Sequence, residues 1–147
     1  RDTKTNEISL RLPTSSQRIL STSVYLRQNG KLEVTWTNAN RAFNIYSITD
    51  QSMRLTHTLT KVSELVQASP DGQFLALSTF NKLIILKTND LKFSEHFNSA
   101  HHQDTICCIS FSPDCKTIAT GGFDARTRVW DLNTGKQKGD VRQRRRY

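Results

Sequence analysis

A tight turn recurs three times along this sequence at a nearly constant interval, and that repetition constrains the fold more than any other feature. The turns are centred on Gly30, Gly72 and Cys115, which lie 42 and 43 residues apart. The first two contain Asn-Gly and Asp-Gly pairs, which are typical of turns that join two antiparallel strands. Equal spacing indicates three copies of one structural unit.

Short runs rich in apolar and β-branched residues flank each turn, and further runs follow after polar gaps. Pro13, Pro70 and Pro113 lie at turns or at the edges of runs, as strands require. No stretch has the periodicity of a long amphipathic helix. The pattern therefore predicts an all-β protein whose strands fall at residues 20–26, 32–36, 42–48 and 53–59, then 64–68, 74–77, 83–87 and 91–97, and finally 106–111, 117–120, 126–132 and, weakly, 137–141.

The last unit resembles a WD40 repeat. It runs AHHQDTICCISFSPDCKTIATGGFDARTRVWDLNTGK from residue 100 to 136, with Ala-His where the family usually has Gly-His, a Ser-Pro-Asp turn, a Gly-Gly-Phe-Asp turn and a closing Trp-Asp pair. The middle unit has Asn81 and Leu86 where the family has its turn aspartate and tryptophan, and the first unit has Asn40 and Tyr46.

The resemblance implies a partial WD40 β-propeller of about three four-stranded blades. The expected repeats cover residues 19–59, 62–97 and 100–136, with an opening strand at 7–12 and a basic tail or poor outer strand at 137–147. Closed propellers have about 4 to 8 blades. We therefore expect the remaining blades to come from the rest of a longer chain or from another chain.

His101, Thr120 and Asp124 combine an imidazole, a hydroxyl and a carboxylate, which are the ingredients of nucleophilic catalysis. No loop suited to an oxyanion hole accompanies them. The resemblance implies that these three residues, together with Trp130, form the structural hydrogen-bond tetrad of the family instead. We therefore expect a protein that is not an enzyme.

The three cysteines, Cys107, Cys108 and Cys115, are an odd number clustered in one stretch, which favours a reduced, intracellular protein in the nucleus or cytoplasm. Side chains alternate between the two faces of a strand, so Cys107 and Cys108 are expected to be buried small apolar residues that do not share a metal ion. No apolar run approaches the ~20 residues of a membrane helix, and no leader is visible. We expect no membrane association, no metal and no cofactor.

Partners of WD40 proteins commonly dock on the face that carries the loops into the first strand and the turns between the second and third strands. The resemblance carries this role to Thr105, Cys107 and Phe123 and, 43 residues earlier, to Val62, Glu64 and Phe80. Two aromatic residues on adjacent blades would anchor a partner, or they would only cap the packing between blades. The expected function is a non-catalytic protein-interaction scaffold within a larger multi-subunit complex.

Positive charge is concentrated at one end of the chain. The net charge is +8, and residues 136–147 hold six basic residues against one aspartate. A basic tail of this kind is a solvated end, a localisation signal or an RNA contact. The alternative function is therefore an RNA- or ribonucleoprotein-binding subunit, for example in ribosome biogenesis, which uses Arg142, Arg144, Arg145 and Arg146 on phosphates.

Overall fold

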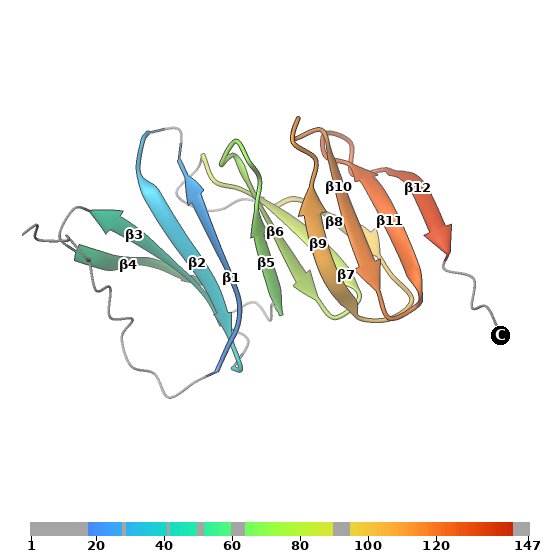
Figure 1. The fold of residues 1–147 in the computed structure, drawn as a ribbon, viewed down its shortest axis with the longest axis horizontal. Coiled ribbons are helices and arrows are strands. Elements are labelled where there is room, and N and C mark those ends of the chain that lie inside the picture. The colour runs from blue at the N-terminus through green and yellow to red at the C-terminus, as the bar shows by residue number, and fades with distance from the viewer. Residues whose placement is uncertain are drawn as a thin grey trace, which may run out of the picture.

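Three four-stranded antiparallel sheets stand in a row in the computed structural model, which describes residues 18–27, 29–40, 42–49, 52–59, 64–89 and 95–142 (Figure 1). The all-β prediction is confirmed. The first sheet contains β1 (Ile19–Leu26), β2 (Leu32–Asn38), β3 (Phe43–Thr49) and β4 (Ser52–Leu59). The second contains β5 (Leu65–Ala68), β6 (Phe74–Thr79), β7 (Lys82–Lys87) and β8 (Glu95–His101), and the third contains β9 (Ile106–Phe111), β10 (Thr117–Gly122), β11 (Arg126–Asp131) and β12 (Gln137–Arg142).

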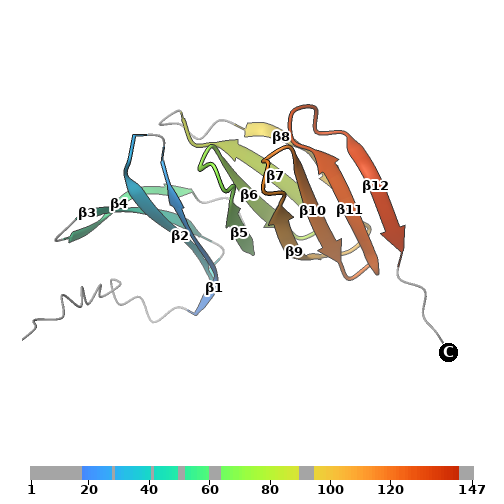
Figure 2. The ribbon, with the colours of Figure 1, turned by 45° about the horizontal axis from the view of Figure 1, so that its top comes forward.

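Each sheet is a meander, because its strands pair in sequence order. Consecutive sheets meet through their first strands: β5 contacts both β1 and β9, and it lies between them in two views (Figures 1 and 2). This is the arrangement of adjacent blades in a propeller.

The predicted strands differ from the observed ones mainly at the end of the second sheet. The run expected at 91–97 is instead β8, which starts at Glu95, while residues 91–94 lie outside the described part of the chain. β8 extends to His101 because its pairing with β7 continues until His101 stands opposite Lys82. Residues 137–142 form the outer strand β12, and the opening strand expected at 7–12 lies outside the described residues.

The recurring turn adopts a left-handed backbone at the same position in all three sheets. The φ angles are +77° at Gly30, +68° at Gly72 and +55° at Cys115. Glycine adopts this conformation without a steric cost, whereas the cysteine in the third turn does not. Similar left-handed backbone geometry at positions 30, 72 and 115 supports the repeat that their spacing indicated.

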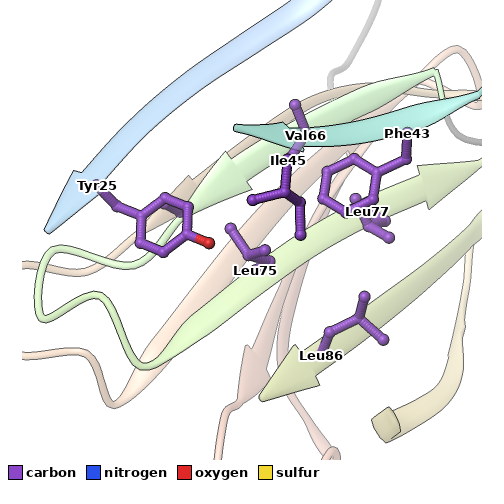
Figure 3. Close-up of a cluster of buried hydrophobic side chains, with 8 residues drawn as sticks. Tyr25, Phe43, Ile45, Val66, Leu75, Leu77 and Leu86 are labelled. Carbon is purple, nitrogen blue, oxygen red and sulfur yellow. The ribbon is translucent and has the colours of Figure 1, made fainter. Parts of the chain in front are cut away.

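Two apolar cores lie between the sheets, one on each face of the middle sheet. Leu75, Leu77 and Leu86 of the middle sheet pack against Tyr25, Phe43 and Ile45 of the first (Figure 3). On the opposite face, Ala76, Leu83 and Ile85 pack against the third sheet through Ile106, Ile118 and Trp130. Adjacent residues of β6 therefore serve different cores, as the alternation of side chains along a strand requires.

Hydroxyl groups also tie the first sheet to the second. The Ser21 hydroxyl accepts a hydrogen bond from the backbone N–H of Val66 at 3.2 Å and lies 3.3 Å from the Val66 carbonyl oxygen. Ser23 accepts one from the N–H of Ala68 at 3.0 Å. These bonds fix the position of β5 along the direction of β1. Apolar contacts alone do not determine it, because they are not directional.

Candidate docking face

A buried chain of hydrogen bonds joins four side chains of the third blade. The indole N–H of Trp130 donates to the Thr120 hydroxyl over 2.9 Å, and that hydroxyl lies 2.8 Å from Nε2 of His102. Nδ1 of His102 lies 3.0 Å from Oδ1 of Asp124. With the ring hydrogen on Nδ1, each donor in this chain meets an acceptor: Trp130 to Thr120, Thr120 to His102, and His102 to Asp124. A closed network of this kind satisfies polar groups that would otherwise be costly to bury.

The histidine of this network is His102, which corrects the prediction of His101. His101 is the last residue of β8, where it pairs with Lys82, and it is exposed. His102 follows the strand and is only 3% exposed. The structure therefore brings Thr120, Asp124 and Trp130 together, but with the neighbour of the expected histidine.

Gly122 leaves the space that His102 and Asp124 occupy. A Cβ atom at position 122 would lie 2.5 Å from Nδ1 of His102 and 2.9 Å from Oδ1 of Asp124. Both distances are shorter than van der Waals contact allows. Gly122 thus has a steric role in the network.

Asp124 is the most heavily bonded member of the network. Its carboxylate accepts from Arg128 Nη1 at 2.7 Å, from the backbone N–H of Gln103 at 2.9 Å and from that of Arg126 at 3.1 Å. Burial alone would raise the pKa of Asp124, but the hydrogen bonds from His102, Arg128 and Gln103 outweigh it and hold the pKa far below its usual range. The carboxylate is therefore ionised throughout the physiological range.

Arg128 is a member that the sequence analysis missed. It is 7% exposed and stands two residues before Trp130 in β11, so its side chain lies on the same face of the sheet. Arg128 could have been identified from the sequence as a basic residue that stands four positions after the turn aspartate and two positions before the tryptophan.

Backbone bonds connect this network to the middle blade. The N–H of His102 donates to the carbonyl oxygen of Asn81 at 2.7 Å, and the Asn81 side-chain amide donates to the carbonyl oxygen of His102 at 3.0 Å. Asn81 stands where the family has its turn aspartate, and it is used here to hold the loop of the next blade. The network thus positions the loop from residue 102 to 105 against both blades.

Two exposed phenylalanines flank that loop. The N–H of Ile106 donates to the carbonyl oxygen of Phe80 at 2.8 Å, and the N–H of Phe123 donates to the carbonyl oxygen of Thr105 at 2.9 Å. Phe80 is 47% exposed and Phe123 is 71% exposed. These backbone bonds link Phe123 to Thr105 and link Phe80 to the next residue, Ile106, and we call the group of Phe80, Thr105 and Phe123 the aromatic rim.

The two phenylalanines stand in turns of unequal length. Thr79 pairs with Lys82 across a two-residue turn, whereas Gly122 pairs with Arg126 across a three-residue turn. Phe80 consequently has a left-handed φ of +51°, while in the longer turn this conformation falls on Ala125 at +57°. An exposed aromatic residue held in a conformation that costs energy is often found where a protein binds a partner.

The other predicted contact residues lie on or before the first strands. Glu64 is half-buried just before β5, Cys107 is exposed in β9, and Val62 lies outside the described residues. A shallow hollow is lined by Glu64, Leu65, Arg18, Leu20 and Ala39. Leu20, which is 43% exposed, was not predicted to be part of this surface because the first unit matches the family pattern least well.

The prediction that Cys107 and Cys108 are buried is wrong. Both thiols are exposed, and Cys115 is half-buried. Two features explain this exposure. β9 shifts register, since Cys108 pairs with Gly121 and Ile106 pairs with Gly122, which leaves Cys107 as an extra residue in a β-bulge. Cys108 alternates with Ile109, which packs toward the middle sheet, and so lies on the opposite face of the third sheet.

Of the residues expected to contact nucleic acid, Arg142 is exposed at the end of β12, and Arg144, Arg145 and Arg146 lie outside the described residues. Two basic residues of the same blade are paired with acids: Arg126 with Asp140, and Lys138 with Asp131 at 3.4 Å. The described part of the third blade therefore has a mixed surface rather than a uniformly basic one.

Within the described ranges, no three His, Cys, Asp or Glu side chains come together in a group that would hold a metal ion. The same residues also include no helix long and apolar enough to cross a membrane.

Residues 92–131 match the family described as WD domain, G-beta repeat. The chain is similar to WD repeat-containing protein 1 of Gallus gallus, with 30% identity over 108 residues, which are 71% of this chain and 17% of that protein. It is also similar to DDB1- and CUL4-associated factor 13 of Danio rerio, with 26% identity over 108 residues, 71% of this chain and 24% of that protein. Actin-interacting protein 1 of Caenorhabditis elegans is 28% identical over 109 residues, 71% of this chain and 18% of that protein.

Residues 92–131 therefore carry a WD40 repeat, and the three sheets have an arrangement consistent with a partial WD40 β-propeller. The chain spans at most 24% of the length of these three relatives. WD40-repeat proteins generally act as scaffolds that bind other proteins and do not catalyse reactions.

Proposed function

We propose that this chain is a non-catalytic segment of a protein-interaction scaffold inside a larger multi-subunit complex, and that a partner protein docks on the aromatic rim. The observation that carries the proposal is the pair of exposed phenylalanines whose backbones bond to the adjacent residues Thr105 and Ile106. Aromatic anchors on a rigid support commonly dominate the binding energy of an interface.

The hydrogen-bond network supports a structural role for the residues that resembled a catalytic set. The Thr120 oxygen already contacts both Trp130 and His102, and Asp124 is bonded to Arg128 and to two backbone N–H groups. The Thr120 side chain is buried, so its hydroxyl does not meet a substrate. The network instead holds the loop that carries Thr105, and this is the rigid support that the rim requires.

We propose an intracellular location for this scaffold. The three thiols are all unpaired, as expected for a protein that works in a reducing compartment. The names of two similar proteins describe association with actin and with DDB1 and CUL4, and these are the first baits to test.

The test is a binding assay with these baits and with cell extract, using the wild-type protein, Phe80→Ala, Phe123→Ala and the double variant. Each single change is expected to weaken partner binding by more than about 1 kcal/mol with little dependence on salt, because burial of an aromatic ring supplies the energy. Leu55→Ala is the matched control, since Leu55 is a large apolar residue of β4 with 46% exposure outside the rim.

Repeating the assay with nuclease and at two salt concentrations separates the scaffold from the RNA-binding alternative. Under that alternative, replacing Arg142 and Arg144 to Arg146 with alanine lowers affinity steeply and flattens its salt dependence. Nuclease-sensitive binding that needs those arginines and ignores the phenylalanines would overturn the proposed docking on the rim.

A further inference from the structure

The bulge in β9 changes how two adjacent cysteines are presented. On a regular strand, neighbouring side chains point to opposite faces of the sheet. Cys107 is the extra residue between the pairs Cys108–Gly121 and Ile106–Gly122, so the regular alternation is interrupted at the cysteine pair. Both cysteines are exposed, whereas Ile106 beside them is 2% exposed in the core.

Both sulfur atoms lie against the same residue of the neighbouring strand. The Cys107 thiol donates to the carbonyl oxygen of Gly121 over 3.4 Å. Sγ of Cys108 lies only 2.6 Å from the position that a Cβ atom would take at Gly121, so it fills the space that this glycine leaves. Burial raises the pKa of the Cys107 thiol, and the nearby Cys108 thiol, which hydrogen-bonds to it, raises that pKa further. The two thiols are therefore neighbours in space as well as in sequence.

The thiols open into a shallow hollow on the face of the third sheet that is turned away from the middle sheet. The hollow is also lined by Gly121, Thr127 and Val141, and Val141 is 69% exposed. Gly122, Ala125 and Arg126 complete its lining, and the guanidinium of Arg126 is paired with the carboxylate of Asp140.

We propose that Cys107 and Cys108 form a two-thiol binding site for a soft, thiol-seeking centre, either a trivalent metalloid or a d¹⁰ metal cation. Sulfur ligands select such centres over hard cations, which prefer oxygen. Two thiols held on one side of a strand bind the same centre together, and the second bond then forms at a high effective concentration.

The binding steps are condensation and ion exchange, with no change of oxidation state. A trivalent arsenical with an As=O group forms two As–S bonds, and its oxygen leaves as water with the two thiol protons. A Cd²⁺ ion forms two Cd–S bonds and releases the two protons to solvent. Neither step needs an oxidant or a reductant.

The equivalent positions in the other blades show how far a following sheet covers this position. Cys108 pairs with Gly121 as Leu65 pairs with Ser78 and as Ser23 pairs with Thr35. Leu65 is half-buried and Ser23 is 8% exposed, and each lies on a face covered by the following sheet. We therefore expect a following blade to narrow the access to Cys108.

The test uses the folded full chain with phenylarsine oxide as the metalloid probe and Cd²⁺ as the cation probe. Bound arsenical is counted by native mass spectrometry, and Cd–thiolate bonds are followed by ultraviolet absorption. The variants are Cys107→Ser and Cys108→Ser, and the matched control is Cys115→Ser, which removes the thiol in the turn between β9 and β10 and leaves the pair intact. Circular dichroism checks that each variant folds.

Wild type and Cys115→Ser are expected to bind one probe molecule per chain, and each single change in the pair is expected to lower the affinity roughly 100-fold. A dithiol competitor should release the arsenical, whereas a monothiol at the same concentration should not. The proposal is overturned if neither probe binds to the wild type, or if one-to-one binding survives in Cys107→Ser or Cys108→Ser. Binding of the arsenical without Cd²⁺, or of both, supports the site and defines which centres it accepts.

Discussion

At the scale of single residues, Thr120 is the point where the third blade's network converges, because its hydroxyl contacts both the indole of Trp130 and the ring of His102. The network shows which residue details follow from sequence. Thr120, Asp124 and Trp130 stand in recognisable motif positions, but two adjacent histidines fit the motif equally well. Strand pairing decides between them, since β8 ends at His101 and only His102 is able to turn inward.

Replacing the two histidines separately tests this assignment. His102→Ala is expected to lower the free energy of unfolding by about 1 to 3 kcal/mol, because it leaves buried partners on Thr120 and Asp124 without a hydrogen bond. His101→Ala is expected to change it by less than about 0.5 kcal/mol, since His101 is exposed. Chemical denaturation of both variants gives the comparison, and equal losses would contradict the assignment.

The lowered pKa of Asp124 predicts acid sensitivity. A carboxylate whose pKa is lower in the folded state stabilises the fold above its unfolded pKa of about 3.9, and this contribution is lost as the pH falls further toward the folded pKa. Stability should therefore decrease below about pH 4. Asp124→Asn should be less stable at neutral pH and should show a weaker decrease on acidification. A variant whose acid profile parallels that of the wild type would rule out this role for Asp124.

The cysteine pair shows where residue-level prediction failed. Side chains were expected to alternate between the two faces of β9. The bulge adds one residue to the strand, and the spacing of apolar residues in the sequence does not reveal it. Gly121, which lies opposite the pair, is the sequence feature that best indicates the bulge, since glycine inside a strand often accompanies one.

At the scale of strands and turns, sequence alone located almost every element. The three turns at residues 30, 72 and 115 set the register of their hairpins, so strands on either side were found within a few residues. Turn length between β6 and β7 and between β10 and β11 was not predicted, because one extra residue in an exposed turn changes neither the apolar pattern nor the overall repeat.

Gly72 has a second task besides its left-handed φ, because it lies against the first blade. A Cβ atom at position 72 would be 2.0 Å from the carbonyl oxygen of Leu26, which is a backbone atom and has little freedom to move. Gly30 has a similar φ but open space around it. The two glycines therefore separate the cost of backbone strain from the cost of a clash between blades.

Gly30→Ala is expected to cost about 1 kcal/mol of unfolding free energy, since only the left-handed conformation is penalised. Gly72→Ala is expected to cost at least ~2 kcal/mol more, because the first and second sheets must also move apart. Urea unfolding of the two variants measures the difference. A similar loss of unfolding free energy in both variants would mean that the backbone at Leu26 moves away from position 72 at little cost.

At the scale of the whole molecule, the middle sheet is covered on both faces and the outer two are each covered on one. Val24 and Leu26 of the first sheet, both 58% exposed, alternate with the buried Tyr25 and so point away from the middle sheet. Within the part of the chain that the structure describes, β4, β8 and β12 form the outer edges of the three sheets. Exposed apolar faces and strand edges both favour association.

The isolated 147-residue polypeptide is therefore expected to self-associate at micromolar concentration. Replacing Val24 and Leu26 together with threonine should reduce this association without disturbing the core between the first two sheets. Analytical ultracentrifugation over a range of concentrations measures it. A single monomeric species that unfolds cooperatively would contradict the expectation.

The two-sided burial of β6 also has a consequence for how the sequence can vary. Leu75 and Leu77 must fit one core while Ala76, which is completely buried between them, must fit the other. A substitution in β6 that packs well against the first sheet can shift the backbone of the strand. The core between the middle and third sheets must then accommodate that shift, and the reverse also holds. Saturation mutagenesis should therefore find that β6 tolerates substitution less than the other strands do. Larger residues should not be tolerated at position 76, and smaller residues should not be tolerated at positions 75 and 77.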